Sequence, residues 1–434
     1  MHDHCTNTPA RFGGIEKVFG SDWNSTGVKL YLKVPEISRV SELETEICRA
    51  VVWPRPATYG DVCALYGDHI LKRYGSGATV VFDGYKHSEL TPKGEEQRRR
   101  SSGKTSPTLV NLQLDQLTCT AQTNFLGNGE NKEILLAMLR PVLEGAGLTV
   151  LQASGDADQL IVATALQLSV TQKSVVVTAT DTDIFAMLIQ RYSSEYDVYM
   201  LMPGVSGRSD KVHNIRSVQS SLGAVKNVLL FAHAMTGSDT TSALFGKGKT
   251  ALLNLLMKNE ELMSEVQLFN SQGAEIEALV SLGERTICAL YGVLESQTLL
   301  GVRHSIFTRP TARKDLTPEL KLKLMLPTSG AARYHTLRVY LQVQNWLGHK
   351  LDAIQFGWRE GFGRLLPVIS DDPPAPDSLL KLVRCGCTTG CNQNCGCRRA
   401  GMPCKSYCAR CEGNCTNNEP VVLDDAETDA VCLV

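Results

Sequence analysis

The chain repeats one pattern, a short apolar strand that ends in an acidic turn and continues into a helix, and this pattern constrains the fold more than any other feature. Runs of apolar and β-branched residues occur at 78–82, 147–152 and 174–178, and aspartates follow each run within a few residues. Successive strands separated by helices form a parallel sheet, because a parallel connection must cross over the sheet. We therefore predict an α/β fold, a parallel sheet flanked by helices.

Six aspartates lie at the ends of successive elements of this pattern, four of them in Asp-x-Asp pairs: Asp83, Asp156, Asp158, Asp181, Asp183 and Asp239. Functional groups gather at the carboxyl ends of the strands in such sheets. Each aspartate taken singly is well explained as a helix cap or turn residue. Carboxylates crowded into one pocket repel each other, however, and Mg²⁺ or Mn²⁺ offsets that repulsion with oxygen ligands. Two such ions, about 4 Å apart, can clamp a phosphodiester.

Four acidic blocks resemble, in order and spacing, those of the flap-endonuclease (XPG-like, PIN-related) superfamily over roughly residues 51–257: Asp83-Gly84, Gly155-Asp156-Ala157-Asp158, Asp181-Thr182-Asp183 and Gly237-Ser238-Asp239. The resemblance implies a PIN-like nuclease with two Mg²⁺ or Mn²⁺ ions, held by the six aspartates, that cuts DNA or RNA near junctions or ends. The family usually has glutamate at the positions of Asp156 and Asp158. It also has an aspartate after its first strand, where this chain offers Glu42 or Glu44 and no clear strand.

Basic residues follow the first Asp-Gly, as they do in that family, where they approach the scissile phosphate. Lys93 and Arg100 are the expected catalytic pair, and Arg98 and Arg99 are expected to bind nucleic acid. A solvated basic run is the alternative interpretation.

A glycine- and lysine-rich turn follows Asp239, just before a predicted helix at 251–257. It resembles the family's helix–two-turn–helix, which grips the duplex backbone. Glycines let the main chain approach a phosphate, and a helix N-terminus favours an anion. The expected nucleic-acid-binding residues are Gly246, Lys247, Gly248 and Lys249. His233, on an apolar helix before this turn, is expected to be a packed histidine; Trp346 and Trp358 are expected to pack in the core.

Nine of the 15 cysteines lie within one short segment: Cys385, Cys387, Cys391, Cys395, Cys397, Cys404, Cys408, Cys411 and Cys415. Almost no apolar residue separates them, so metal is expected to hold this segment folded. Nine thiolates satisfy three tetrahedral Zn²⁺ ions if three of them bridge. The segment resembles the tesmin/TSO1-like CXC domain, which binds three zincs and commonly contacts DNA, here through Arg398 and Arg399. A zinc-stapled protein-docking module is the alternative.

The predicted organisation has an atypical segment at 1–45, the α/β domain at 46–260 and a helical region at 261–368. A Pro-rich linker at 369–380, the CXC domain at 381–417 and an acidic disordered tail at 418–434 follow. This two-module combination resembles that of mobile-element-like animal proteins.

Composition limits the partners. The chain has 44 basic and 45 acidic residues, so nucleic-acid binding must come from local patches. We find no apolar leader and no run of 18 apolar residues, and expect a protein that is neither secreted nor membrane-bound, located in the nucleus or otherwise the cytoplasm.

The leading hypothesis is therefore a Mg²⁺- or Mn²⁺-dependent, structure-selective nuclease that its zinc module tethers to DNA. The lack of the first-strand aspartate motivates the alternative, an inactive nuclease-fold scaffold that binds nucleic acid or protein. A purely structural zinc protein leaves the six aspartates unexplained.

Overall fold

The computed structural model describes most of the chain between the central sheet and the cysteine-rich segment: residues 37–42, 51–84, 90–95, 112–154, 156–171, 174–204, 209–293, 298–308, 325–372, 385–388, 390–399, 403–404, 408 and 410–417. Only the backbone is described for 37–42 and 304–308. Arg98, Arg99 and Arg100 lie outside the described residues, as do the linker beyond residue 372 and the predicted tail.

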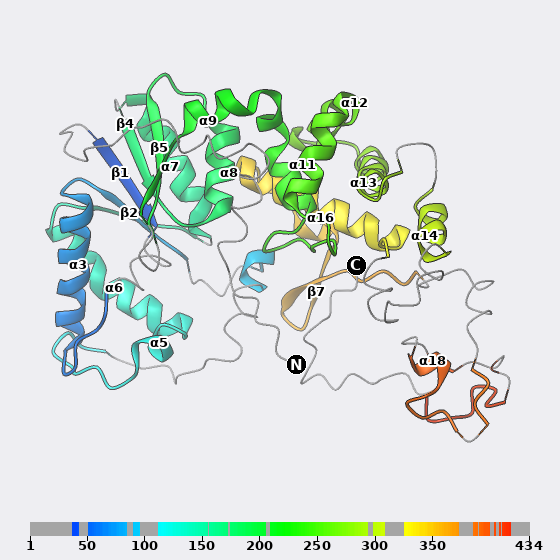
Figure 1. Ribbon diagram of the computed structural model, residues 1–434. Coiled ribbons are helices and arrows are strands. Elements are labelled where there is room, and N and C mark those ends of the chain that lie inside the picture. The colour runs from blue at the N-terminus through cyan, green and yellow to red at the C-terminus, as the bar shows by residue number, and fades with distance from the viewer. Residues whose placement is uncertain are drawn as a thin grey trace.

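A six-stranded sheet forms the centre of the α/β part (Figure 1). Its order is β3-β2-β1-β4-β5-β6, and every neighbouring pair is parallel except β5 and β6 at one edge. The strands are β1 (Ile37–Glu42), β2 (Thr79–Phe82), β3 (Thr149–Gln152), β4 (Ser174–Thr178), β5 (Asp197–Met202) and β6 (Lys211–Asn214). Because β2, β3 and β4 are the three predicted strands, the predicted fold class, a parallel sheet flanked by helices, is confirmed.

The middle of the sheet holds a strand that the sequence pattern did not predict. β1 pairs with β2 on one side and β4 on the other, with Val40 opposite both Thr79 and Val177. Its sequence, ISRVSE, has only two apolar residues and lacks the continuous apolar run typical of a buried parallel strand. β1 lies before the predicted boundary at residue 46, although it pairs with strands after that boundary. Glu42, expected to follow no clear strand, is the last residue of β1.

Helices cover both faces of the sheet. On β2 the side chains alternate: Val80 and Phe82 pack in one core, while Val81 packs in the other. The first core lies against α3 (Tyr59–Tyr74) and α6 (Gly129–Gly145), with the short α5 (Gln122–Phe125) beside them, and the second lies against α7 (Ala157–Thr171) and α8 (Thr182–Arg191). α3 begins at a capping box formed by Thr58 and Asp61.

The second core continues into the C-terminal helices, with α16 running beneath α11 in Figure 1. In order these are α9 (Ile215–Leu222), η4 (Gly223–Val228), α10 (Leu229–Met235), α11 (Lys249–Lys258), α12 (Glu260–Glu265), η5 (Val266–Asn270), α13 (Ile276–Leu290), α14 (Leu299–Thr308), α16 (Ser329–Leu347) and η7 (Ala353–Phe356). None of the described helices is both long and apolar enough to cross a membrane.

The predicted helical region also contains a two-stranded antiparallel hairpin, β7 (Trp358–Gly361) and β8 (Arg364–Pro367). After the hairpin, Asp372 accepts a hydrogen bond from the Gly330 amide at 2.5 Å, so the start of the predicted linker packs against the N-terminus of α16. In the cysteine-rich segment the structure describes one short helix, α18 (Gly396–Arg399).

Candidate functional site

The carboxyl ends of the parallel strands bring the acidic turns to one edge of the sheet. Asp83 follows β2, Asp156 and Asp158 follow β3, and Asp181 and Asp183 follow β4. The strand order places β1 at the centre, with connections leading to opposite sides, which is the switch point where ligands bind in open α/β sheets. Glu42 ends this central strand in register with Val81, two residues before Asp83.

Lys93 joins three of the predicted carboxylates. Its Nζ lies 2.7 Å from Asp239 Oδ2, 3.5 Å from Asp156 Oδ2 and 3.8 Å from Asp158 Oδ2. Asp239 comes from the turn after α10, more than 80 residues along the chain from the other two. The fold therefore brings acids from separate segments, and a predicted catalytic lysine, to one place.

Asp83 is tied to the same edge through the start of α7. Its Oδ1 accepts a hydrogen bond from the Ala157 amide at 2.7 Å. Gly84 lets the two turns approach, because a Cβ at this position would lie 2.4 Å from the Ala153 carbonyl oxygen. Asp83 thus serves as a cap for α7 and lies next to the turn that carries Asp156 and Asp158.

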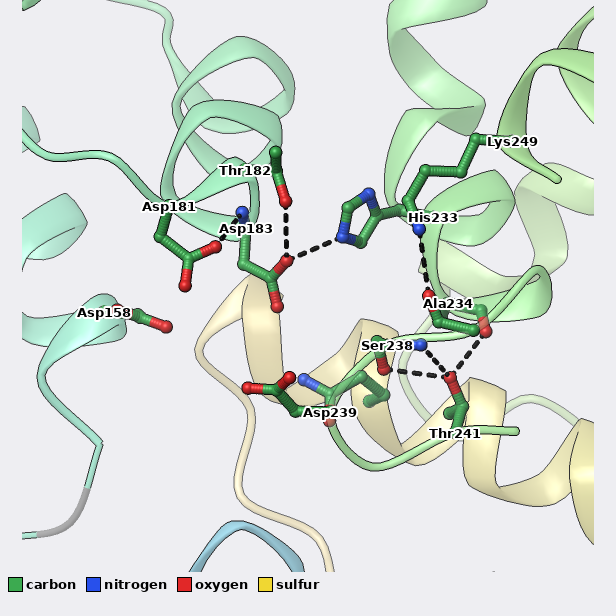
Figure 2. Close-up of polar contacts among 12 residues, drawn as sticks. Asp158, Asp181, Thr182, Asp183, His233, Ala234, Ser238, Asp239, Thr241 and Lys249 are labelled. Atoms are coloured by element: carbon green, nitrogen blue, oxygen red, sulfur yellow. Dashed lines mark hydrogen bonds and ion pairs between the residues drawn. The ribbon is translucent and has the colours of Figure 1, made fainter. Parts of the chain in front are cut away.

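Asp181 and Asp183 occupy the first turn of α8. Asp181 is its N-cap and accepts from the Asp183 amide at 2.8 Å, so the cap interpretation is correct for this residue. Asp183 is buried, and its Oδ1 lies 3.3 Å from Thr182 Oγ1 and 2.6 Å from His233 Nε2. Figure 2 shows the carboxylates of Asp158, Asp181, Asp183 and Asp239 pointing into one common space.

The electrostatics of the site follow from burying like charges together. Burial, reinforced by the charge of Asp183, raises the pKa of Asp181 to about 6. Burial also raises the pKa of Asp156, although Lys93 opposes it. Burial acts to lower the pKa of Lys93, but the three carboxylates around it outweigh that effect and hold the pKa well above its usual value.

The pKa of Asp183 is lowered, in contrast to the raised pKa values of Asp156 and Asp181. Burial would raise its pKa, but the charge and hydrogen bond of His233, followed by the charges of Lys93 and Lys249, hold the pKa well below its usual value. Asp183 is therefore ionised in the folded protein at neutral pH.

The turn that carries Asp239 is fixed by its own hydrogen bonds (Figure 2). Thr241 Oγ1 accepts from the Ser238 amide at 2.9 Å and donates to the Ala234 carbonyl at 2.6 Å. Gly237 has a φ of +106°, and a Cβ there would lie 2.9 Å from Ala243. Only glycine adopts this conformation without strain, so the Gly-Ser-Asp sequence sets the direction in which Asp239 leaves α10.

The two lysines of the Gly-Lys-Gly-Lys turn lie in different surroundings. Lys249, at the start of α11, donates from Nζ to the Gly237 carbonyl at 2.9 Å and so braces the Asp239 turn from within. Lys247 Nζ lies 4.7 Å above the Tyr291 ring. Gly248 is the N-cap of α11, which leaves main-chain amides at a helix N-terminus.

The donor set fits a hard divalent cation by its chemistry, since carboxylate oxygens are the ligands that Mg²⁺ and Mn²⁺ prefer. Burial, reinforced by neighbouring carboxylates, raises the pKa values of Asp156 and Asp181 even with Lys93 present. Among the described residues, sets of three or more ligand atoms within 4.8 Å of one another occur only in the cysteine cluster. The carboxylates are thus spread around the Lys93 ammonium.

One contributor to this site was undervalued from the sequence. Glu42, which was expected to follow no clear strand, ends β1, but its side chain is not described. His233 was expected to be packed; it is buried and its ring contacts Trp346 at 5.3 Å, but it also contacts a site carboxylate. The only sequence signal was its position on an apolar helix six residues before Asp239, which does not indicate Asp183 as its partner.

The cysteines form a separate, compact cluster. Cys385 Sγ lies 3.7 Å from Cys391 Sγ, 3.8 Å from Cys404 Sγ and 3.7 Å from Cys411 Sγ, and none of the nine thiols is in a disulfide. Sulfurs at the corners of a tetrahedron around zinc, with Zn–S bonds of about 2.3 Å, are roughly 3.8 Å apart. Three sets of four cysteines meet the distance requirement, and each includes Cys385. This geometry could hold zinc.

No family model matches the sequence, and no curated protein is similar to it. Solved structures show a distant likeness. The catalytic core of Rad2 in complex with DNA substrate is 15% identical, with 72% of this chain and 88% of that chain covered and a TM-score of 0.36. A bacteriophage T5 flap endonuclease in complex with DNA and metal ions is 12% identical, with 70% and 99% covered and a TM-score of 0.33. The eukaryotic junction-resolving enzyme GEN-1 is 13% identical, with 75% and 77% covered and a TM-score of 0.34.

Proposed function

We propose that this protein is a Mg²⁺- or Mn²⁺-dependent nuclease that hydrolyses phosphodiester bonds in DNA, with RNA as the second substrate to test. The observation that carries the proposal is the convergence of carboxylates from separate acidic turns on one ammonium group at the carboxyl edge of the sheet. Such a concentration of buried negative charge is costly unless cations bind to it, and its oxygen ligands select hard divalent ions.

In this proposal Asp83, Asp156, Asp158, Asp181, Asp183 and Asp239 hold two divalent ions. When bound, these ions supply Lewis-acid activation of water and neutralise charge on the phosphate. Glu42, at the end of β1, adds a carboxylate in the place where the flap-endonuclease family has its first aspartate. Lys93, already beside the carboxylates, and Arg100 neutralise the scissile phosphate.

In this proposal, residues outside the carboxylate cluster bind the phosphate backbone of the duplex. Gly246, Lys247 and Gly248 offer a cation and main-chain amides at the N-terminus of α11 to a backbone phosphate. Lys249 supports them from inside by bracing the Asp239 turn. Arg98 and Arg99, which lie outside the described residues, are expected to bind nucleic acid as well. The nine cysteines hold three Zn²⁺ ions, and the exposed Arg398 and Arg399 of the CXC-like module tether the enzyme to DNA.

The test is cleavage of branched or flap DNA by zinc-loaded protein in Mn²⁺. We expect cleavage by wild type and a loss of at least about 100-fold in Asp181→Ala and Asp239→Asn, the scale of removing one essential catalytic interaction. Asp197→Asn is the matched control, because Asp197 lies at the opposite end of β5 and pairs with Arg216. Cleavage that survives both site substitutions would overturn the proposal.

A second candidate function is a catalytically inactive scaffold that binds nucleic acid or protein. The observation that favours it is the absence of aspartate at the end of the central strand, where Glu42 stands. The same assay separates the two: a scaffold binds flap DNA in a salt-dependent manner but never cuts it. Conversely, cleavage that is lost in Glu42→Gln places this glutamate among the groups that the reaction needs.

A further inference from the structure

His233 belongs to α10, an element that contributes no aspartate, yet it contacts the acidic site. The residue is 2% exposed, and its Nε2 lies 2.6 Å from Asp183 Oδ1. The ring is held on another side by Trp346 of α16, whose ring centroid lies 5.3 Å away at an interplanar angle of 63°. The imidazole is thus fixed by packing and directed at a single carboxylate oxygen.

Because of this contact, the two carboxylate oxygens of Asp183 have different surroundings. Oδ1 is engaged by His233 and Thr182, both from the protein interior. Figure 2 shows the other oxygen pointing away from His233, into the space shared with Asp158, Asp181 and Asp239. A carboxylate held in this way cannot rotate freely about its terminal torsion, so one oxygen is kept available for a ligand in that space.

We propose that His233 is a positioning residue that holds Asp183 in the orientation needed to bind a divalent cation. This inference rests on the proposed function. Residues that hydrogen-bond a ligating carboxylate set its orientation, and their loss typically costs 10- to 100-fold in metal affinity.

A histidine that merely fills the core looks different, and the same region contains one. His335 of α16 is fully buried, and its Nε2 lies 3.0 Å from the Met235 carbonyl oxygen with no carboxylate at that atom. Burial lowers its pKa to about 4, so it is neutral at physiological pH. His335 therefore serves as a control for any effect that comes only from disturbing a buried imidazole.

The experiment measures Mn²⁺ binding by electron paramagnetic resonance on zinc-loaded protein, with thermal unfolding recorded in parallel. His233→Gln keeps an amide donor at about the reach of Nε2, and His233→Met has similar length with no donor. We expect His233→Met to bind Mn²⁺ 10- to 100-fold more weakly and His233→Gln to remain within about threefold of wild type. His335→Met is expected to lower the unfolding temperature but to leave Mn²⁺ affinity unchanged.

Other outcomes of this experiment separate a failure of the inference about His233 from a failure of the proposed function. Mn²⁺ affinity of His233→Met equal to that of wild type overturns the inference, even if cleavage falls. If His233→Met does not fold, His233→Asn replaces it, because its donor is too short to reach Asp183 and the same loss is expected. A wild-type protein that binds no Mn²⁺ contradicts the proposed function instead, so the two failures are distinguishable.

Discussion

The Lys93 ammonium lies among the carboxylates of the candidate site. Its ammonium lies within 4 Å of Asp156, Asp158 and Asp239, all largely buried. An ammonium and a divalent ion compete for the same oxygens, since both satisfy the same excess of negative charge. Under the proposed function, a bound divalent ion would displace the lysine from some of its partners and leave it able to contact a phosphate.

This competition predicts opposite effects of one substitution on binding and on cleavage. Lys93→Met is expected to tighten Mn²⁺ binding by about tenfold, equivalent to ~1.4 kcal/mol, because its competitor is gone. Cleavage by the same variant is expected to fall, because the phosphate loses a cation. Electron paramagnetic resonance and the flap assay measure the two effects. Lys72→Met, on the exposed side of α3, is the control, and weaker Mn²⁺ binding by Lys93→Met would contradict the prediction.

Asp181 predicts a pH dependence of stability in the absence of added divalent metal. Burial raises its folded pKa from 3.8 to about 6, so the folded state binds the extra proton. The stabilising contribution is present below pH 4 and is lost as the pH rises through 6. Asp181→Asn keeps an N-cap but does not titrate, so its stability relative to wild type is expected to rise by on the order of 2 kcal/mol from pH 4 to 7, after allowance for partial exposure. Urea unfolding followed by tryptophan fluorescence measures this, and a constant difference across the window would refute it.

At the scale of elements, the site depends on turns that leave a strand or helix in one defined direction. The turn after α10 is the clearest, because Gly237 combines a positive φ with a close approach to Ala243. Gly237→Ala is expected to cost about 1–3 kcal/mol and to weaken Mn²⁺ binding, because the turn must shift and Asp239 moves with it.

Gly273 provides the matched control for this substitution. It also has a positive φ, +73°, but a Cβ there meets nothing within 4 Å, and it lies in the connection between η5 and α13. Gly273→Ala is expected to lower stability through backbone strain alone and to leave Mn²⁺ affinity intact. Equal effects of the two alanines on Mn²⁺ binding would show that Gly237 does not orient Asp239.

The whole molecule has two kinds of core. The α/β part and its helices bury apolar side chains in two large clusters, whereas the described residues of the cysteine-rich segment bury little besides cysteine sulfur. Chelation is therefore expected to release about three Zn²⁺ ions and unfold only the cysteine-rich segment. Metal analysis and circular dichroism check this, because the helical signal of the α/β part should persist. Loss of that signal together with zinc would contradict separate cores.

Much of the fold could be predicted because its signals are local. The apolar runs of β2, β3 and β4 and the helix after each predict strands and crossovers from a few adjacent residues. The strands β1, β5 and β6 were not predicted, since ISRVSE and its counterparts mix polar and apolar residues and depend on their neighbours for burial. The hairpin β7–β8 was not predicted either, because its residues also mix polar and apolar types and lie in a region of mainly helical patterns.

The candidate site, too, has one part that local sequence predicts and another part that depends on long-range contacts. Acidic turns after strands predict that carboxylates share one edge, because parallel strands end on the same side. The pairing of His233 with Asp183 spans 50 residues, and the contact of Lys93 with Asp239 spans 146, and no periodicity in the sequence reports either one.

The sequence by itself determined the α/β class, the group of six aspartates and the nine-cysteine segment, because each is encoded by neighbouring residues whose chemistry allows few alternatives. Only the tertiary structure decided that β1, with Glu42 at its end, is the central strand, that Lys93 lies among the carboxylates, and that Asp183 is held by a histidine. These depend on which distant segments pack together, a choice governed by burial over the whole chain.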